Sequence, residues 1–380
     1  MTYQKLELFY SYNYYDLIVT ILLLIISLGI ANFLTLKFKI NNTISILMYT
    51  IHHLYFLVYF YYSIDYGLDS TSYFLEYKGY EYLNYEPGQV LLYKFIGLLN
   101  SLNIDYLNIN YLFSILSLIS FYYLLYILKL SCYKQQIYFK FVLLLIFLPS
   151  IHFWIMGYSK DTITFFCISV VFYEFVKKKQ NFLIIFIMIF LISLIRLHIS
   201  LMIILSISIV HILNSKNYKN TLFVALLTFL FLILSLKNII SETPTIENIK
   251  SFLNMFRNLY VSNENTAILT NNFFYKIYYY LFVPNLFTIR GNDLFFLVIT
   301  IENTYLVLLF LYLILKKNFN FKVFKKNLFF LFFGLISLTL FTFITSNLGI
   351  AARQKWFIVI SLIIFLLLIK GKIFKKIEMN

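Results

Sequence analysis

Long blocks of apolar residues, separated by short polar segments, run through most of the chain. A helix needs about 20 such residues to cross a hydrocarbon core of about 30 Å. Blocks of this kind predict about eleven membrane spans (about ten to thirteen), near 15–36, 44–62, 107–128, 139–157, 160–176, 181–196, 199–213, 220–240, 294–315, 328–346 and 355–370. We therefore expect an all-α, polytopic transmembrane bundle that forms one integral membrane domain over residues 1–380.

Two longer polar segments, 63–106 and 241–293, interrupt this pattern and are expected to be loops on the outer side. The apolar stretch 87–100 within the first is too short to span a membrane. Because it starts at Pro87, a favoured first residue of a helix, we expect an interfacial or re-entrant helix there. The aromatic stretch 271–290 predicts a similar helix or a further span.

Composition agrees with a membrane protein. Of the 380 residues, 61% are hydrophobic and 12% are charged, with a mean hydropathy of +0.83. An ordinary globular chain is about 25% charged, and one soluble core could not bury so much apolar surface. These values exclude a soluble enzyme, a disordered chain and a disulfide-rich secreted scaffold. The two cysteines, Cys132 and Cys167, lack the spacing of metal ligands, and we expect neither a metal nor another cofactor.

The net charge of +15 does not require a nucleic-acid partner, because membrane proteins concentrate lysine and arginine in their cytoplasmic loops. If the N-terminus lies outside and the predicted spans alternate, most lysines fall in inner loops and most carboxylates fall outside. The C-terminus is then cytoplasmic, and any chemistry lies on the outer face.

The arginines do not follow the lysines. The chain has four, Arg196, Arg257, Arg290 and Arg353, and this topology places all of them on the outer side. The planar guanidinium binds phosphate in a bidentate manner and keeps its proton. The arginines therefore indicate an anionic ligand that carries phosphate, or alternatively ion pairs with outer carboxylates.

The sequence PSIHFWIMGYSKD at 149–161 combines a predicted tight turn at Gly157–Ser159 with charges that open the next span. Ser159 suits a helix N-cap, and Asp161 suits the positive end of the helix. Capping alone would explain both residues. It does not explain His152, which we expect to face the bundle rather than lipid.

Two other segments place cations beside membrane spans. Arg196 and His198 lie at a predicted hairpin tip, where they line a polar cavity or extend to the interface. The segment 345–355, TSNLGIAARQK, predicts a turn in which small residues let a phosphate approach Arg353, or an ordinary outer loop. In the second span, at least one of His52 and His53 must face protein, and we expect a satisfied buried histidine.

The pattern PSxHFWxxGxxKD, an R-x-H tip and NLGIAxRQK near the C-terminus resembles bacterial O-antigen (Wzy-type) and related repeat-unit polymerases, which are similar in architecture to GT-C glycosyltransferases. The resemblance covers about residues 65–356 and rests on these three short motifs. It implies an inner-membrane enzyme that transfers a glycan from undecaprenyl pyrophosphate to a lipid-linked repeat unit, with membrane lipid and other polysaccharide export proteins as its surroundings.

The resemblance also implies roles for particular residues. The cations expected to bind the pyrophosphate or lipid-linked glycan are Lys160, Arg196, Arg257, Arg290, Arg353 and Lys355. A carboxylate or imidazole would accept the proton of the acceptor hydroxyl, and the candidates are Asp69, His152 and His198.

Two alternatives remain open. The stretch Asp65–Ser70 also resembles the acidic outer loop of GT-C enzymes that use a polyprenyl-phosphate sugar donor, although it follows the second predicted span rather than the first. A lipid-linked oligosaccharide flippase would need cations at mid-depth and access from both sides, and the cations here cluster at predicted outer tips.

Overall fold

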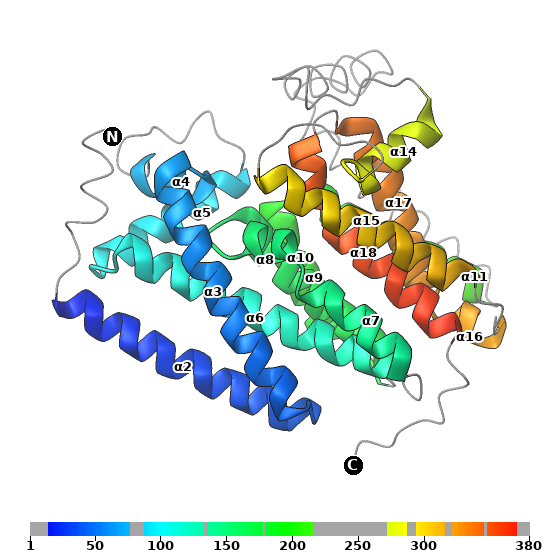
Figure 1. Cartoon of the computed structure of the whole chain (residues 1–380), viewed down its shortest axis with the longest axis horizontal. Coiled ribbons are helices and arrows are strands. Elements are labelled where there is room, and N and C mark those ends of the chain that lie inside the picture. The colour runs from blue at the N-terminus through cyan, green and yellow to red at the C-terminus, as the bar shows by residue number, and fades with distance from the viewer. Residues whose placement is uncertain are drawn as a thin grey trace. The chain divides into compact units, whose positions relative to one another are not determined.

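The computed structural model describes residues 14–76, 87–132, 136–177, 179–215, 272–286, 294–315, 321–345 and 348–370, and every regular element in these ranges is a helix (Figure 1). In chain order the helices are α2 (Tyr14–Phe38), α3 (Asn42–Tyr66), α4 (Asp69–Glu76), α5 (Pro87–Ser101), α6 (Tyr106–Ser131), α7 (Gln136–Ile146), α8 (Pro149–Ile155), α9 (Lys160–Val176), α10 (Phe182–Ile195), α11 (Leu197–Asn214), α14 (Phe273–Phe282), α15 (Leu294–Leu315), α16 (Phe321–Lys326), α17 (Leu328–Ile344) and α18 (Leu348–Lys370). The prediction of an all-α chain is confirmed for these residues.

Within the described ranges, six helices are long and apolar enough to cross a membrane: α2, α3, α6, α11, α15 and α18. Three shorter apolar helical stretches are Phe139–Ile155, Phe182–Ile195 and Leu328–Ile344. The chain thus has the helices of a multi-pass membrane protein, while the finer count of about eleven spans stays a prediction. The predicted span 220–240 lies outside the described residues.

The structure corrects two predicted boundaries. The span expected at 139–157 is broken into α7 and α8, because Pro149 lacks the backbone N–H and its ring disfavours a continuous helix. Pro149 instead opens α8 as its first residue. The helix expected at 355–370 begins earlier, at Leu348. The short helix expected from Pro87 is present as α5.

The described helices fall into two compact units: Met1–Leu130 with Leu143–Arg196, and Ser131–Val142 with Leu197–Asn380. In the first unit, hydroxyl groups join α2, α3 and α6. Ser45 Oγ lies 2.5 Å from Thr35 Oγ1 and 2.7 Å from Tyr122 Oη, and Ser27 Oγ lies 3.1 Å from Tyr111 Oη. Such side-chain bonds between membrane helices are favourable because lipid supplies no competing partner.

The end of α3 turns the chain into α4. Gly67 adopts the left-handed conformation (φ 69°) that a side chain would disfavour, and its N–H bonds to Ser63 O. Tyr106 Oη on α6 lies 2.9 Å from both Ser70 Oγ and Thr71 Oγ1 on α4. The first turn of α4 is therefore fixed to α6, although α4 is only eight residues long.

The second unit is built around α17 and α18, which pack along each other, with α11 against α17 and α14 against α18 (Figure 1). A Cβ on Gly334 would lie 2.6 Å from the Leu362 side chain, so glycine allows the two helices to approach closely. Ser361 Oγ donates to Phe330 O across the same contact at 2.7 Å. Small residues and interhelical hydrogen bonds are the usual means of helix association in lipid.

Candidate functional site

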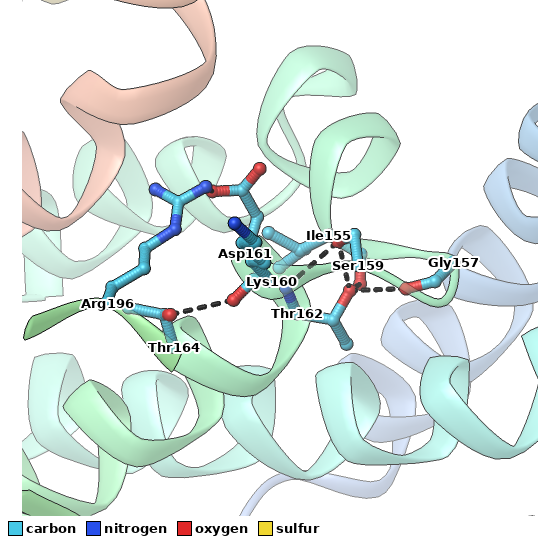
Figure 2. Close-up of polar contacts among 8 residues, drawn as sticks. All are labelled: Ile155, Gly157, Ser159, Lys160, Asp161, Thr162, Thr164 and Arg196. Atoms are coloured by element: carbon cyan, nitrogen blue, oxygen red, sulfur yellow. Dashed lines mark hydrogen bonds and ion pairs between the residues drawn. The ribbon is translucent and has the colours of Figure 1, made fainter. Parts of the chain in front are cut away.

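The turn between α8 and α9 has the geometry that the sequence predicts. Ser159 is extended (φ −153°), and its Oγ accepts a hydrogen bond from Thr162 N at 3.2 Å, as an N-cap does. Thr162 Oγ1 lies 3.0 Å from Ile155 O and 2.5 Å from Gly157 O, which closes the turn (Figure 2). The predicted N-cap and tight turn are confirmed.

Contacts with three other helices hold this turn. A Cβ on Gly157 would lie 2.1 Å from the ring of Tyr59 on α3, so only glycine fits there without movement. The Tyr158 N–H donates to Asn110 Oδ1 on α6 at 3.0 Å, and the Tyr158 hydroxyl donates to Leu92 O on α5. The start of α9 therefore has a fixed position within the first unit.

An almost buried ion pair lies at the start of α9. Arg196 follows the last residue of α10, and its Nη2 is 2.5 Å from Asp161 Oδ1 (Figure 2). Arg196 is 9% exposed and Asp161 is 7% exposed. The alternative reading of the outer arginines as partners of carboxylates is thus correct for this one.

The pair leaves part of the guanidinium unused. Arg196 Nη1 is buried and has no hydrogen-bond partner in the part of the chain that the structure describes. Figure 2 shows this nitrogen directed away from the Asp161 carboxylate. A buried donor without a partner is costly, at about 1–3 kcal/mol, so a polar atom from a ligand would be stabilised there.

Helix α5 fixes the backbone that carries Arg196. A Cβ on Gly88 would lie 2.3 Å from the carbonyl oxygen of Ile195, and a backbone group cannot move aside as the end of a side chain can. The Arg196 N–H also donates to Ile192 O at 2.7 Å. Helix α5 therefore contacts Ile195, the residue before Arg196, and also Tyr158, in the turn before α9.

Three groups at this place favour an anion: the open Nη1 of Arg196, the N-terminus of α9 and the neighbouring Lys160. Lys160 is half-buried in the first turn, and its carbonyl accepts a hydrogen bond from Thr164 Oγ1 at 2.7 Å. A helix N-terminus carries partial positive charge, and guanidinium donors match phosphate oxygens. Asp161 lowers the net positive charge and orients Arg196, which favours a specific oxyanion geometry over a general attraction.

The expected catalytic residues lie on three different helices. Asp69 is the half-buried first residue of α4. His152 is 0% exposed, with its ring stacked 3.9 Å from that of Phe121, so it lies in the protein interior. His198 is exposed near the start of α11, in the second unit, beside the Phe341 ring.

The segment 345–355, which was expected to form a phosphate-gripping turn, is helical from Leu348 onward, and its residues 346–347 lie outside the described residues. Residues 348–355 are helical, because Ala351, Ala352 and the long side chains after them are strong helix formers. Arg353 is half-buried in the second turn of α18. A free-standing loop around Arg353 is therefore ruled out, while its role as a ligand stays a prediction. Arg257 and Arg290 lie outside the described residues.

Lys355 is engaged inside the second unit. It is 1% exposed, and its Nζ donates to Asn303 Oδ1 on α15 and, at 3.5 Å, to Leu281 O on α14. The buried carboxylate of Glu302 interacts electrostatically with the ammonium group. Asn303 Nδ2 in turn donates to Pro284 O at 2.8 Å. Lys355 thus joins α18, α15 and α14 through two hydrogen bonds.

Sequence reasoning missed Glu302 and Asn303, although a signal was present. Both lie within the apolar block 294–315, and an ionisable residue inside a membrane span indicates a buried partner or a function. The role of Gly88 carried no comparable signal, because a close backbone contact between distant segments leaves no local pattern. Comparison of the chain with protein-family models, curated proteins and solved structures finds no match.

Proposed function

We propose that this protein is a glycosyltransferase of the bacterial inner membrane that polymerises surface-polysaccharide repeat units. It transfers a glycan from undecaprenyl pyrophosphate to a sugar hydroxyl of a second lipid-linked repeat unit on the outer face. The observation that supports the proposal best is the buried Arg196, which is oriented by Asp161 and keeps one terminal nitrogen open.

The chemistry requires charge stabilisation rather than redox chemistry. The bond between the anomeric carbon and the pyrophosphate oxygen breaks, the acceptor oxygen bonds to that carbon, and the hydroxyl proton passes to a base. Arg196 and Lys160 would bind the phosphate oxygens, on which negative charge grows as the bond breaks. Removing one such donor typically lowers the rate about 10²–10³-fold. Lipid substrates reach the site from the membrane that the apolar helices occupy.

A second glycosyltransferase reaction fits one further observation. Asp69 opens α4, whose first turn is held to α6 through Ser70 and Thr71, so its carboxylate is on a firmly positioned helix. A membrane transferase that uses a polyprenyl-phosphate sugar donor would need such a base. The two reactions differ in the donor and in the length of the product.

The surface-glycan ladder of a deletion strain, with the gene restored in trans, tests the proposal. We expect glycans that stop at one repeat unit in the deletion strain and a full ladder after complementation. A repeat unit that lacks a sugar would instead support the second transferase. An unchanged ladder would contradict both transferase reactions and would favour a transporter instead.

Complementation with Asp69→Asn tests the base. We expect loss of the ladder with normal protein abundance, because an amide cannot accept the proton. Asp65→Asn is the matched control, since Asp65 is an exposed carboxylate at the end of α3. A full ladder with Asp69→Asn would remove Asp69 from the mechanism.

A further inference from the structure

One tyrosine of α3 contacts both segments that carry the proposed active site. Tyr59 is 3% exposed, and its hydroxyl lies 2.8 Å from Ser70 Oγ, in the first turn of α4 and directly after Asp69. The same hydroxyl borders the turn before α9, because a Cβ on Gly157 would lie 2.3 Å from Tyr59 Oη. The turn before α9 and the first turn of α4 therefore lie on either side of one hydroxyl group.

The surrounding hydrogen bonds fix the direction of this contact. A hydroxyl group has one proton to donate. Tyr106 donates its proton to Ser63 Oγ at 2.9 Å, so the 2.9 Å contact between Ser70 Oγ and Tyr106 Oη uses the proton of Ser70. Ser70 Oγ can then only accept from Tyr59. The Tyr59 hydroxyl is thus the donor, and Ser70 keeps its bond to Tyr106 when that hydroxyl is removed.

The groups around this contact are buried and hydrogen-bonded. Ser63, Ser70, Thr71 and Tyr106 are each at most 5% exposed. Ser63 Oγ donates to Phe60 O at 2.7 Å, and Thr71 Oγ1 donates to Ser63 O at 2.7 Å. A buried polar network whose members are hydrogen-bonded holds them rigidly. The network therefore fixes the helix turn that contains Asp69 to α3 and α6.

The ring of Tyr59 is held on the opposite side. It packs edge-on against the ring of Phe153 on α8, with the centroids 5.6 Å apart. Gly157 follows the end of α8, and α9 begins three residues later with the turn whose Asp161 pairs with Arg196. A displacement of Tyr59 would therefore be transmitted to the turn of Asp69 and to the turn that orients Arg196.

We infer that Tyr59 is a positioning residue, which holds the Asp69 base at a fixed place relative to the Arg196 site. This assignment rests on the proposed function, in which Asp69 accepts the proton of the acceptor hydroxyl and Arg196 binds the phosphate of the leaving group. Both groups act on the same reacting carbon and oxygen, so their spacing controls the rate. A misplacement of about 1 Å can lower a rate about 10²-fold.

Steady-state kinetics of the purified full-length protein in detergent test this assignment. The substrate is the lipid-linked repeat unit extracted from the deletion strain. Tyr59→Phe keeps the ring beside Gly157 and Phe153 and removes the donor to Ser70. We expect kcat to fall about tenfold to a hundredfold with KM within about twofold of the parent value, because the cations that bind phosphate keep their places. Thermal unfolding of the same samples should give a midpoint close to that of the parent protein.

Tyr62→Phe is the matched control. Tyr62 lies about one turn further along α3 and packs its ring against the same Phe153, at 5.1 Å. Losing its hydroxyl leaves the bond between Tyr59 and Ser70 in place, so kcat and KM should equal those of the parent protein. If Tyr59→Phe does not fold, Ser70→Ala decides, because it removes the same hydrogen bond from the side of α4 and should lower kcat without raising KM.

The outcomes separate this assignment from the proposed function. Parent-like kcat in a folded Tyr59→Phe protein, a loss that lies entirely in KM, or an equal loss in Tyr62→Phe would overturn the role of Tyr59 and leave the proposed function standing. A parent protein that does not elongate the repeat unit would overturn the proposed function, and the role of Tyr59 with it.

Discussion

Each compact unit contains a buried cation, and the two cations differ in how completely their donors are used. In the first unit, Arg196 pairs with Asp161 and keeps Nη1 open. In the second, Lys355 donates to Asn303 and Leu281, with Glu302 supplying negative charge. A buried donor that has no partner, at a turn fixed by neighbouring helices, can bind a ligand. A donor that already bonds to residues of two other helices instead stabilises the fold.

A cation in a membrane span is therefore not by itself a ligand site. The sequence presents Lys355 and Arg196 alike, as cations beside small or polar residues near a predicted outer surface. The contacts that each cation makes in the structure distinguish the two. Removing one member of a buried ion pair typically costs about 3–5 kcal/mol, and replacing both members can be neutral.

The largest effects are expected when Arg196 or Lys355 is replaced, first alone and then together with the carboxylate beside it. Arg196→Met should abolish the glycan ladder and lower stability by about 3–5 kcal/mol, because Asp161 is left as a buried charge. Adding Asp161→Asn should restore the thermal midpoint in detergent but not the ladder. A ladder restored with the fold would show that Arg196 has only a structural role.

Lys355→Met should also lower stability, by about 1.5–3 kcal/mol, because the charged hydrogen bonds to Asn303 and Leu281 and the attraction to the buried Glu302 carboxylate are lost. Adding Glu302→Gln should restore the midpoint, and here the ladder should return as well. The two double variants are measured side by side by thermal unfolding and gel electrophoresis. A folded Lys355→Met, Glu302→Gln protein without a ladder would show that Lys355 takes part in the reaction and does not only stabilise the fold.

Local signals predicted the helices well. Apolar block length placed α2, α3, α6 and α15 within a few residues, and Pro87 and Ser159 marked the starts of α5 and α9. The length of the apolar block 139–157 predicts one helix, whereas Pro149 divides it into α7 and α8. These elements were predictable because a span or a cap is decided within a few consecutive residues.

The site was only partly predictable. The sequence singled out Arg196 and Asp161 but could not join them, because their pairing depends on how α9 packs against α10. It expected a turn at Arg353, where helix propensity prevails instead. Contacts between distant segments, such as that of Gly88 with Ile195, follow from packing and leave no periodic trace.

An intermediate effect is expected from Gly88→Ala, which tests whether the Arg196 site depends on its support. The new Cβ would lie 2.3 Å from Ile195 O, so either α5 or the Arg196 backbone must shift. Overpacking of this kind costs about 1–3 kcal/mol, and we expect a shortened ladder as well. Gly29→Ala is the control, since a Cβ there meets nothing within 4 Å and alanine favours the helix. Equal ladders in both variants would show that α5 does not position Arg196.

The smallest effect concerns a buried carboxylate that a helix end, rather than a cation, stabilises. Asp105 precedes α6 and accepts a hydrogen bond from Asn108 N at 2.9 Å, while burial raises the pKa of its carboxyl to about 6. The folded state therefore binds this proton more tightly than the unfolded chain, in which the pKa is about 3.9.

Stability should rise as the pH falls from 7 to about 4, because the buried charge is lost in the folded state first. Asp105→Asn keeps the cap and removes the charge, so its free energy of unfolding should exceed that of the parent protein by about 1 kcal/mol at pH 7 and equal it near pH 4. A constant difference across this range would mean that Asp105 stays ionised, and that a helix N-terminus can compensate a buried charge as fully as Asp161 compensates Arg196.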